Sequence, residues 1–315
     1  MLKFLFEKNK TRIAELDSPL YFNMNIDEDI PADDISVTFS GAASIDNAEL
    51  ITVRDDGSVI FSGIIDEIRR CFDGGRLYTK VNARSMAAAL LDNESRPVSY
   101  SEVSTSVIFL NHLKPFGLTA YTGADKTLFG GMNVAKGSTN WQVLYTFCSK
   151  AFGKKPRINP DGTADFEGIN SDKALIFSNK SGINYNSIKE NKRLCKSITR
   201  VYSKLTENGG YSVITSNPES AESSVRRERF IDESNRSTPL GIAKSIINNS
   251  NKEAYVVTLN CPGRYVDILG AKAAVEDELL GKLDSLRVSS LYYSLTPSGD
   301  YTSITLKRGQ ANVDT

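Results

Sequence analysis

The stretch ELITVRDDGSVIFSGIIDEIRR, residues 49–70, decides the class of fold, because an Asp-Gly step separates two runs typical of strands. Asp56 and Gly57 tolerate the positive φ angles that a tight hairpin turn requires. A second break of this kind, Asp-Gly-Gly at 73–75, leads into the run RLYTKVNAR. With the short runs KFLFEK, TRIAEL, YFNMNID and DISVTFSG, these hairpins predict a small β-barrel or β-sandwich over about the first ninety residues.

Helical patterns begin near the end of this β block. The run SMAAALLDN, residues 85–93, predicts a short helix with Ser85 as its N-cap. After residue 95 the pattern changes, and apolar residues at helical spacing predict a longer helix over residues 101–115, with Gly117 as its C-terminal cap. The residues that set this spacing are Val103, Val107, Leu110 and Leu113.

A second long helix is predicted after Thr139, where Thr139 and Gln142 fit a capping box. Apolar residues form one stripe along it before Gly153: Trp141, Leu144, Phe147, Cys148 and Ala151. We therefore predict a compact α+β module over about residues 95–178, inserted after the first β domain.

The stretch RINPDGTADFEGI, residues 157–169, allows two interpretations, because three carboxylates lie close together in it: Asp161, Asp165 and Glu167. An EF-hand calcium loop needs glycine at position 6 and glutamate at position 12. Counted from Asp161, these positions hold Phe166 and Asp172. The Pro-Asp-Gly run, in contrast, supplies all that a β-turn needs. We therefore predict a hairpin whose carboxylates face solvent.

The chain returns to β patterns from about residue 197, beginning with the run SITRVYSKLT. One helix is predicted over residues 239–249, with Thr238 at its start. The run AKAAVEDELLGKL, residues 271–283, is ambiguous, because its composition favours a helix although it lies among strands. A last hairpin is predicted around the turn at 297–300.

Composition limits the possible classes of protein. The 315 residues exceed what one hydrophobic core usually serves, so two or three domains are expected. The 38 basic and 38 acidic residues give no net charge, which argues against a general nucleic-acid binder. The apolar run at residues 4–6 is too short for a signal peptide, and no segment is long enough for a membrane span. We expect synthesis and folding in the cytosol.

Motifs for catalysis and metal binding are missing from the sequence. KGST at 136–139 has the wrong order for a phosphate-binding loop, and neither G-x-G-x-x-G nor G-x-S-x-G occurs. His112 is the only histidine, and we expect it to be partly exposed near a helix end. The four cysteines form no C-x-x-C pair and indicate free, mostly buried thiols: Cys71, Cys148, Cys195 and Cys261. Scattered carboxylates alone do not identify a glycosidase.

Four pieces of the chain, in this order, resemble the baseplate hub proteins of contractile-tailed phages and phage-tail-like particles, of the Mu type and the Bacillus-prophage type. Residues 61–97 resemble the end and exit of the first barrel of that family. The helix and hairpin of its inserted domain correspond to residues 136–169, the approach to its second barrel to residues 225–265, and its closing hairpin to residues 286–309.

The resemblance implies a mainly β (α+β) fold with two related β-barrel domains and an inserted module. The implied domains are a first barrel at 1–94, an inserted α+β domain at 95–178, and a second barrel with one helix at 179–315. It also implies strand structure for residues 271–283. Three chains would form a ring of six barrels that adapts a six-fold tail tube to a three-fold spike.

The implied role is structural, so we expect no enzyme activity, no catalytic, cofactor-binding or metal-binding residues, and no cofactor. The expected partners are two further copies, the spike, the tail tube, and the tape-measure and baseplate wedge proteins, without specific nucleic-acid binding or membrane insertion. The expected location is the baseplate of a virion or phage-tail-like particle. Two alternatives stay open: a tail-associated cell-wall hydrolase, for which we expect an additional domain that this chain does not have, and the hub of a non-contractile tail or secretion-system spike complex.

Overall fold

The computed structural model describes the chain except for residues 170, 221–222, 233–238 and 309–315. The chain forms two compact units. The first consists of residues 1–172, 262–270 and 290–302, and the second of residues 173–261, 271–289 and 303–315. Two long strands, β20 (Gly281–Thr296) and β21 (Gly299–Arg308), therefore contribute residues to both units.

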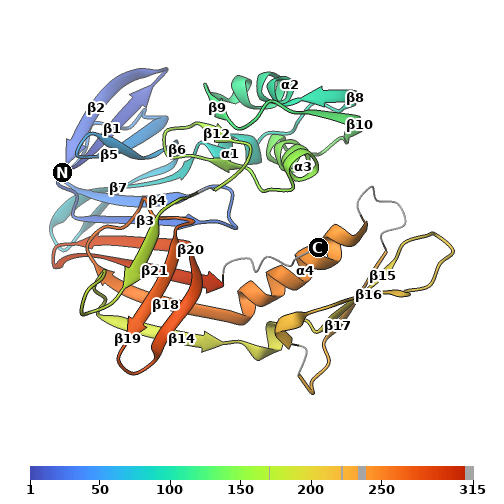
Figure 1. Ribbon diagram of the computed structural model, residues 1–315. Helices are drawn as coiled ribbons and strands as arrows, with labels where there is room; N and C mark the ends of the chain where they lie inside the picture. Colours follow the sequence, from blue (N-terminus) through green and yellow to red (C-terminus); the bar gives the residue numbers. More distant parts are fainter. Residues whose placement is uncertain (170, 221–222, 233–238, 309–315) are drawn as a thin grey trace. The chain divides into compact units, whose positions relative to one another are not determined.

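An antiparallel sheet forms the body of the first unit, with the strand order β20-β3-β4-β7-β6-β5-β1-β2 (Figure 1). Alternate side chains of these strands are buried, and Phe4 lies edge-on to both Phe22 and Phe39 with ring centroids 5.2 Å apart. The mainly β prediction is confirmed. The strands are β1 (Leu2–Lys8), β2 (Thr11–Asp17), β3 (Tyr21–Asp27), β4 (Asp34–Ser40), β5 (Leu50–Asp55), β6 (Ser58–Asp73) and β7 (Arg76–Ser85).

The predicted hairpin within residues 49–70 is confirmed as β5 and β6, which pair around Asp56 and Gly57. Both turn residues have positive φ angles, 46° and 91°. Gly63 in β6 is required for a different reason, since a Cβ atom there would lie 2.1 Å from the backbone oxygen of Arg84 in β7. The two strands therefore approach closely only because residue 63 has no side chain.

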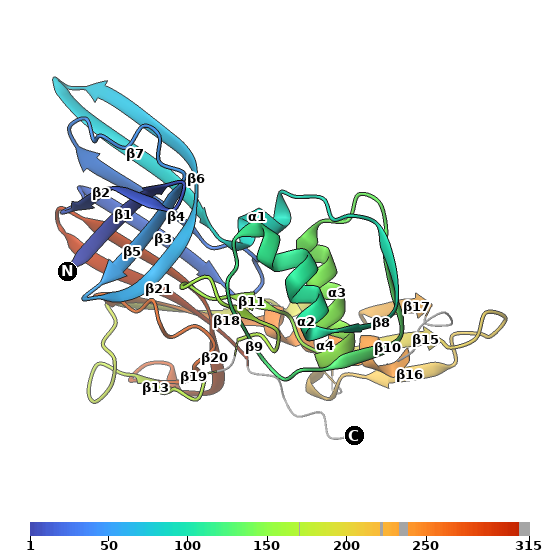
Figure 2. The ribbon, with the colours of Figure 1, turned by 90° about the horizontal axis from the view of Figure 1, so that it is seen from above.

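The first unit also contains a helical segment, in which α1, α2 and α3 lie beside β8 and β10 (Figure 2). Its core includes the fully buried side chains of Leu144 and Phe147 from α3. The elements are α1 (Ala87–Leu91), β8 (Val98–Ser104), α2 (Thr105–Ile108), a π-helical turn (Phe109–Leu113), a 3-10 turn (Lys114–Phe116), β9 (Tyr121–Thr122), β10 (Thr127–Val134), α3 (Asn140–Phe152), β11 (Arg157–Ile158) and β12 (Ala164–Asp165).

Two helix starts were predicted wrongly. The segment 101–115 begins as strand β8, and its helix starts only after Ser104, whose side chain accepts a hydrogen bond from the amide of Val107. Ser85 is not a helix cap, because it lies at the end of β7 and its hydroxyl accepts from the amide of Asp33 at 3.1 Å. The capping box of Thr139 and the left-handed cap at Gly153 are confirmed.

A buried ion pair joins the helical segment to the sheet within the first unit. Arg157 of β11 contacts the carboxylate of Asp33 and donates to the backbone oxygen of Asp27 at 3.1 Å. The side chains of Asp33 and Arg157 are only 5% and 8% exposed. Burial raises the pKa of Asp33, and the positive charge of Arg157 offsets part of this rise. The pair therefore holds the β3–β4 loop against β11 at a site where neither charge reaches water.

The second unit contains its own part of the sheet, in the order β14-β18-β21-β20, with β19 paired to β20 and β13 paired to β19. Residues 271–283 hold β19, the turn and the start of β20, so the strand prediction for this run is confirmed. The turn predicted at 297–300 connects β20 and β21. The remaining strands are β13 (Ala174–Phe177), β14 (Ser187–Lys192), β18 (Tyr255–Pro262) and β19 (Lys272–Asp277).

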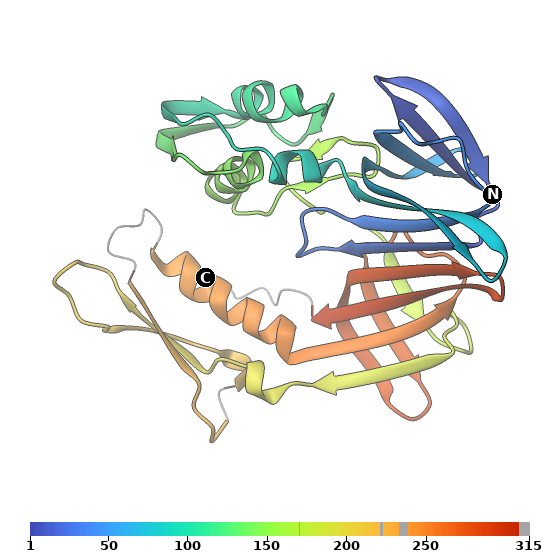
Figure 3. The ribbon, with the colours of Figure 1, turned by 180° about the vertical axis from the view of Figure 1, so that it is seen from behind.

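A three-stranded sheet with the order β16-β15-β17 completes the second unit, and helix α4 lies along one of its faces (Figure 3). Val201 of β15 packs on that face against Ala243 and Ile247 of α4. The helix runs from Pro239 to Ala254, longer than predicted, and Thr238 lies outside the described residues. The strands are β15 (Arg200–Lys204), β16 (Val213–Ser216) and β17 (Glu228–Asp232), with 3-10 turns at Leu194–Lys196 and Pro218–Ser220.

Candidate assembly surfaces

His112 is buried, so the expectation that it would be partly exposed was wrong. Its Nδ1 lies 3.1 Å from Asn140 Oδ1 and 3.1 Å from Ser95 Oγ, and its Nε2 lies 3.0 Å from the hydroxyl of Tyr100. The amide nitrogen of Asn140 donates to the backbone oxygen of Asn93, which turns Oδ1 towards the imidazole. Nδ1 is therefore the protonated nitrogen, and Nε2 accepts from Tyr100.

Burial lowers the pKa of His112, and the hydrogen bond to Asn140 offsets only part of that decrease. The packed interior tolerates His112 because its imidazole is neutral and both ring nitrogens are hydrogen-bonded. The side chains at hydrogen-bond distance from the ring are those of Ser95, Tyr100 and Asn140, and none of these three is a carboxylate. The arrangement links β8, the π-helical turn and α3, which is a structural role.

The run KGST at 136–139 also has a structural role. The amide of Gly137 donates to a carboxylate oxygen of Glu94 at 2.7 Å, and the hydroxyl of Thr139 accepts from the amide of Gln142. A carboxylate that occupies the amide of the loop glycine would repel a phosphate group.

The hairpin predicted for residues 157–169 is confirmed as β11 and β12, which pair around the turn at Asn159 to Thr163. Each of the three carboxylates that raised the calcium interpretation accepts a hydrogen bond from a backbone amide. Asp161 accepts from Thr163 at 2.9 Å, Asp165 from Glu167 at 2.9 Å, and Glu167 from Ala124 at 3.0 Å. These carboxylates therefore stabilise turns.

The four cysteines are free thiols, as predicted, but the expectation that most of them are buried was wrong, because Cys71 is half-buried and Cys195 is exposed. Cys148 and Cys261 are buried, and burial raises the pKa of both, to about 12 for Cys261. Among the residues that the structure describes, no three His, Cys, Asp or Glu side chains are grouped in a way that could hold a metal ion. No helix of the described ranges is long and apolar enough to cross a membrane.

Exposed apolar side chains mark the surfaces where this chain can contact partners. The end of the β6–β7 hairpin is one of them. Phe72 and Leu77 are paired directly across the two strands and are 76% and 39% exposed. Their side chains lie on the same face of the hairpin as the buried side chain of Val81, but beyond the end of the hydrophobic core.

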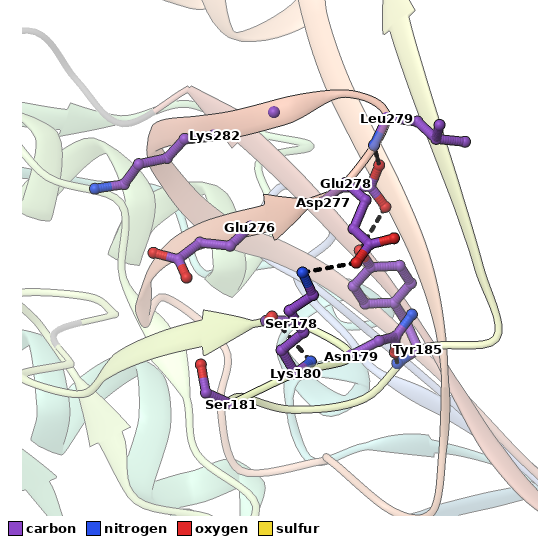
Figure 4. Close-up of a pocket in the computed structure, with 11 residues that line it drawn as sticks. Ser178, Asn179, Lys180, Ser181, Tyr185, Glu276, Asp277, Glu278, Leu279 and Lys282 are labelled. Atoms are coloured by element: carbon purple, nitrogen blue, oxygen red, sulfur yellow. Dashed lines mark hydrogen bonds and ion pairs between the residues drawn. The ribbon is translucent and has the colours of Figure 1, made fainter.

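The turn between β19 and β20 is a second surface, beside an open pocket of about 610 Å³ that the 178–185 loop also lines (Figure 4). Asp277 fixes this turn, since its carboxylate accepts from the amides of Leu279 and Leu280 at 2.9 and 2.8 Å and from the Tyr185 hydroxyl at 2.6 Å. These hydrogen bonds, with Tyr185 first, lower the pKa of Asp277. Leu279 points away from the pocket and is 95% exposed.

Two further carboxylates make this turn acidic. Glu276 is exposed, and Glu278 lies 2.7 Å from the ammonium group of Lys180, with both of these side chains 73% exposed. Ion pairs between such exposed groups contribute little to stability. We name residues 276–280 the acidic turn.

The third surface is the face of the β16-β15-β17 sheet opposite to α4. Ile214, Tyr202 and Phe230 are direct neighbours in one row across the three strands. The rings of Tyr202 and Phe230 are stacked 4.9 Å apart at 13°, and Tyr211 lies edge-on to Phe230 at 5.4 Å. Phe230 and Ile214 are 60% and 54% exposed. We name these four residues the aromatic face.

Charged groups border the aromatic face. The carboxylate of Glu228 accepts from the Tyr202 hydroxyl at 3.1 Å, and that of Asp232 lies 3.6 Å from the Lys204 ammonium group. Arg200, two residues before Tyr202 on β15, is exposed and makes no ion pair within the described ranges. Arg226, just before β17, is exposed as well. These three basic and two acidic side chains leave the border with one net positive charge.

The sequence matches no protein-family model and no curated protein. Its fold, however, matches solved structures along nearly the whole chain. A tail protein from Neisseria meningitidis MC58 has 17% identity and a TM-score of 0.77, with 98% of this chain and 96% of that chain covered. The 43 kDa tail protein of prophage MuSo2 from Shewanella oneidensis has 13% identity and a TM-score of 0.80, with 98% of each chain covered.

A protein of the type VI secretion system of E. coli also shares the fold. It has 7% identity and a TM-score of 0.56, with 93% of this chain and 74% of that chain covered, and it is described as structurally similar to the T4 tail proteins gp27 and gp5. The resemblance to tail hub proteins that the sequence indicates is thus confirmed for the fold. The aromatic face was not predicted, because the residues of its row lie on separate strands, and the acidic turn was not predicted, because the sequence does not show that Leu279 is exposed.

Proposed function

We propose that this chain is a non-catalytic structural subunit of a baseplate hub, in a contractile tail or a phage-tail-like particle. The observation that carries the proposal is the fold it shares, over 98% of its length, with two tail proteins at TM-scores of 0.77 and 0.80. A match that also covers 96% and 98% of those chains involves their whole architecture, not one common module.

In the proposed assembly three copies form a ring in which each copy contributes two β-barrel domains. The presence of two β-rich units in one chain supports this arrangement, because three such chains supply six β-rich units. A ring with six similar parts and three-fold symmetry can meet a six-fold tube on one side and a three-fold spike on the other. Ring closure requires head-to-tail contacts that repeat around one axis.

The domain division that belongs to this proposal is a first barrel at 1–94, an inserted module at 95–178 and a second barrel at 179–315. The proposed partners are the spike, the tail tube, the tape-measure protein and the baseplate wedge proteins. The proposed place of action is the baseplate of the particle. The adjacent exposed pair of Phe72 and Leu77 and the apolar row of the aromatic face support a role in assembly, since contiguous exposed apolar patches mark interaction sites.

One other function has an observation in its favour, the hub of a secretion-system spike complex. The E. coli secretion-system protein shares the fold, and so does a chain in a Francisella PdpA–VgrG complex, with a TM-score of 0.61, 11% identity, and 98% of this chain and 52% of that chain covered. The higher TM-scores and nearly complete mutual coverage of the two tail proteins favour the tail hub.

Light scattering on the purified chain, alone and with its spike protein, tests the proposal. We expect a trimer in at least one of these two samples. A chain that stays monomeric at high concentration even with the spike present contradicts the hub function.

Zymography on bacterial cell walls tests the non-catalytic part separately. We expect no clearing by the isolated chain, with lysozyme as the positive control. Clearing that persists after further purification contradicts this part and favours the cell-wall hydrolase.

A further inference from the structure

We propose that the acidic turn of one copy docks on the aromatic face of the next copy, as a head-to-tail contact of the ring. This inference rests on the proposed function, because it names the surfaces through which copies of the hub touch. Both surfaces are exposed in one chain, and each has what the other lacks. The acidic turn presents an isolated leucine with carboxylates beside it, and the aromatic face presents an apolar row with arginines beside it.

Apolar complementarity is the first argument. Leu279 is 95% exposed and is held outward by the hydrogen bonds that Asp277 makes to the turn. The row formed by Ile214, Tyr202 and Phe230 is about 10 Å wide across three strands, wide enough to receive one projecting side chain and its turn. Docking would remove all of these side chains from water at once.

Charge complementarity is the second argument. Glu276 and Glu278 precede Leu279 in the acidic turn. Glu278 is paired with Lys180 at 2.7 Å, and Glu276 is exposed and points to the other side of the turn from Leu279 (Figure 4). On the aromatic face, Arg200, Arg226 and Lys204 outnumber the carboxylates of Glu228 and Asp232, so the border is positive by one charge even though Glu228 lies directly across from Arg200. The acidic turn therefore meets positive charge on this face, and the arginines meet carboxylates.

The ring stacking of the aromatic face argues against a nucleic acid as its occupant. Base stacking needs a free ring face. Tyr202 and Phe230 cover each other at 13° and 4.9 Å, so their faces are already in contact.

The positions of the two surfaces explain why the contact joins different copies. Within the second unit, the β19–β20 turn and the β15–β17 sheet lie at opposite ends, in both the front and the back view (Figures 1 and 3). Because the two complementary surfaces lie at opposite ends of the second unit, they cannot contact each other within one copy. The chain forms head-to-tail contacts, which close into a ring or continue into a filament.

Sedimentation velocity over a range of concentrations tests the contact. We expect Leu279→Ser to weaken self-association by about tenfold or more, the effect of withdrawing one buried leucine from a contact. Leu194→Ser is the matched control, since Leu194 is 72% exposed but lies outside both surfaces, and it should associate like the unchanged chain. Because both leucines are exposed, circular dichroism should show that both variants fold normally.

A charge exchange tests the pairing itself. Arg200→Glu alone and Glu276→Arg alone should each weaken self-association, and the chain that carries both changes should regain it. An equimolar mixture of the two single variants should associate again, because the changed face of Arg200→Glu meets the changed turn of Glu276→Arg, and the unchanged face of the second variant meets the unchanged turn of the first.

The outcomes separate this inference from the proposed function. A trimer that is unaffected by Leu279→Ser and by both charge reversals overturns the contact and leaves the hub intact. Loss of spike binding with normal self-association assigns the acidic turn to the spike and overturns the contact between copies. An unchanged chain that never self-associates, even with its spike, contradicts both.

Discussion

Replacing Arg157 with methionine should destabilise the first unit strongly, because it leaves the buried carboxylate of Asp33 without its positive partner. The change keeps the length and apolar part of the side chain. It removes the contact with Asp33 and the hydrogen bond to the backbone oxygen of Asp27. Even in the unchanged chain, Oδ1 of Asp33 has no hydrogen-bond partner among the described residues.

The size of the effect follows from how Asp33 can respond. Removing one partner of a buried ion pair typically costs about 3–5 kcal/mol. Protonation of Asp33 sets the upper limit, because neutralising a carboxyl with an ordinary pKa near 3.9 costs about 4 kcal/mol at pH 7. The same protonation costs only about 1.5 kcal/mol at pH 5. We therefore expect the unfolding free energy of Arg157→Met to fall by about 4 kcal/mol at pH 7 and by less than half of that at pH 5.

The sign of the pH effect follows from the raised pKa of Asp33. The pKa of Asp33 is higher in the folded state than in the unfolded chain. Its protonation therefore favours the folded state at low pH, and this contribution is lost as the pH rises through the folded pKa. Without Arg157 the pKa of Asp33 rises further, so the variant loses the most unfolding free energy near neutral pH. Adding Asp33→Asn to Arg157→Met removes the buried charge and should recover most of the stability at pH 7.

Urea unfolding followed by fluorescence measures the effect, because Trp141 is the only tryptophan and lies in α3, 8% exposed. Arg70→Met is the matched control, since Arg70 pairs with Asp46 at a distance of 2.5 Å where both side chains are about half exposed, and its loss should be small. A loss below about 1 kcal/mol for Arg157→Met at pH 7, or an equal loss at pH 5 and pH 7, would refute the reasoning.

Three further predictions concern the first unit. Thr139→Ala removes the hydroxyl that caps α3 and should lower the unfolding free energy by about 1 kcal/mol in the same urea assay, whereas no loss would show that the cap is dispensable. Gly63→Ala places a Cβ atom against the backbone oxygen of Arg84, so its urea midpoint should fall by an amount that corresponds to about 2 kcal/mol or more; an unchanged midpoint would mean that β6 and β7 can separate freely. Because the pKa of His112 is lowered in the folded state, the unfolded chain binds the proton first, and stability should be lost as the pH falls from about 6.5 through the folded pKa. A His112→Gln chain should lack this part of the pH dependence of stability. An unchanged pH dependence in that variant would contradict the assignment.

The hairpins were predictable from sequence because their signals are local. Asp56 and Gly57 tolerate the backbone angles of their turn, and the Pro-Asp-Gly run does the same between β11 and β12. The capping box of Thr139 is equally local, since both of its hydrogen bonds lie within four residues. Such features depend on neighbours in the chain, so the sequence contains the information they need.

The start of the helix after Ser104 was missed because one apolar spacing fits two structures. Val103 and Val107 are four residues apart, which fits a helix, yet Val103 lies in β8 and packs from a strand. Pairing of β8 with β10 decides between the two, and β10 lies more than twenty residues further along the chain. Tertiary pairing of this kind overrides local periodicity.

The environment of His112 and the aromatic face were not predictable for a related reason. Ser95, Tyr100 and Asn140 reach His112 from three separate segments, so nothing next to the histidine in the sequence indicates its burial. Tyr202 and Phe230 are stacked although 28 positions separate them, because β15 and β17 are parallel neighbours. The resemblance to a known family indicated the fold but did not identify these residues.

The strand shared by the two units sets the order in which this chain can fold during synthesis. Residues 290–295 of β20 pair with residues 22–27 of β3, so β3 has only β4 as a neighbour until residues 290–295 have been synthesised. Until then β3 presents an open edge, which is where unfinished β proteins aggregate. A polypeptide broken off before residue 290 could not complete its first unit.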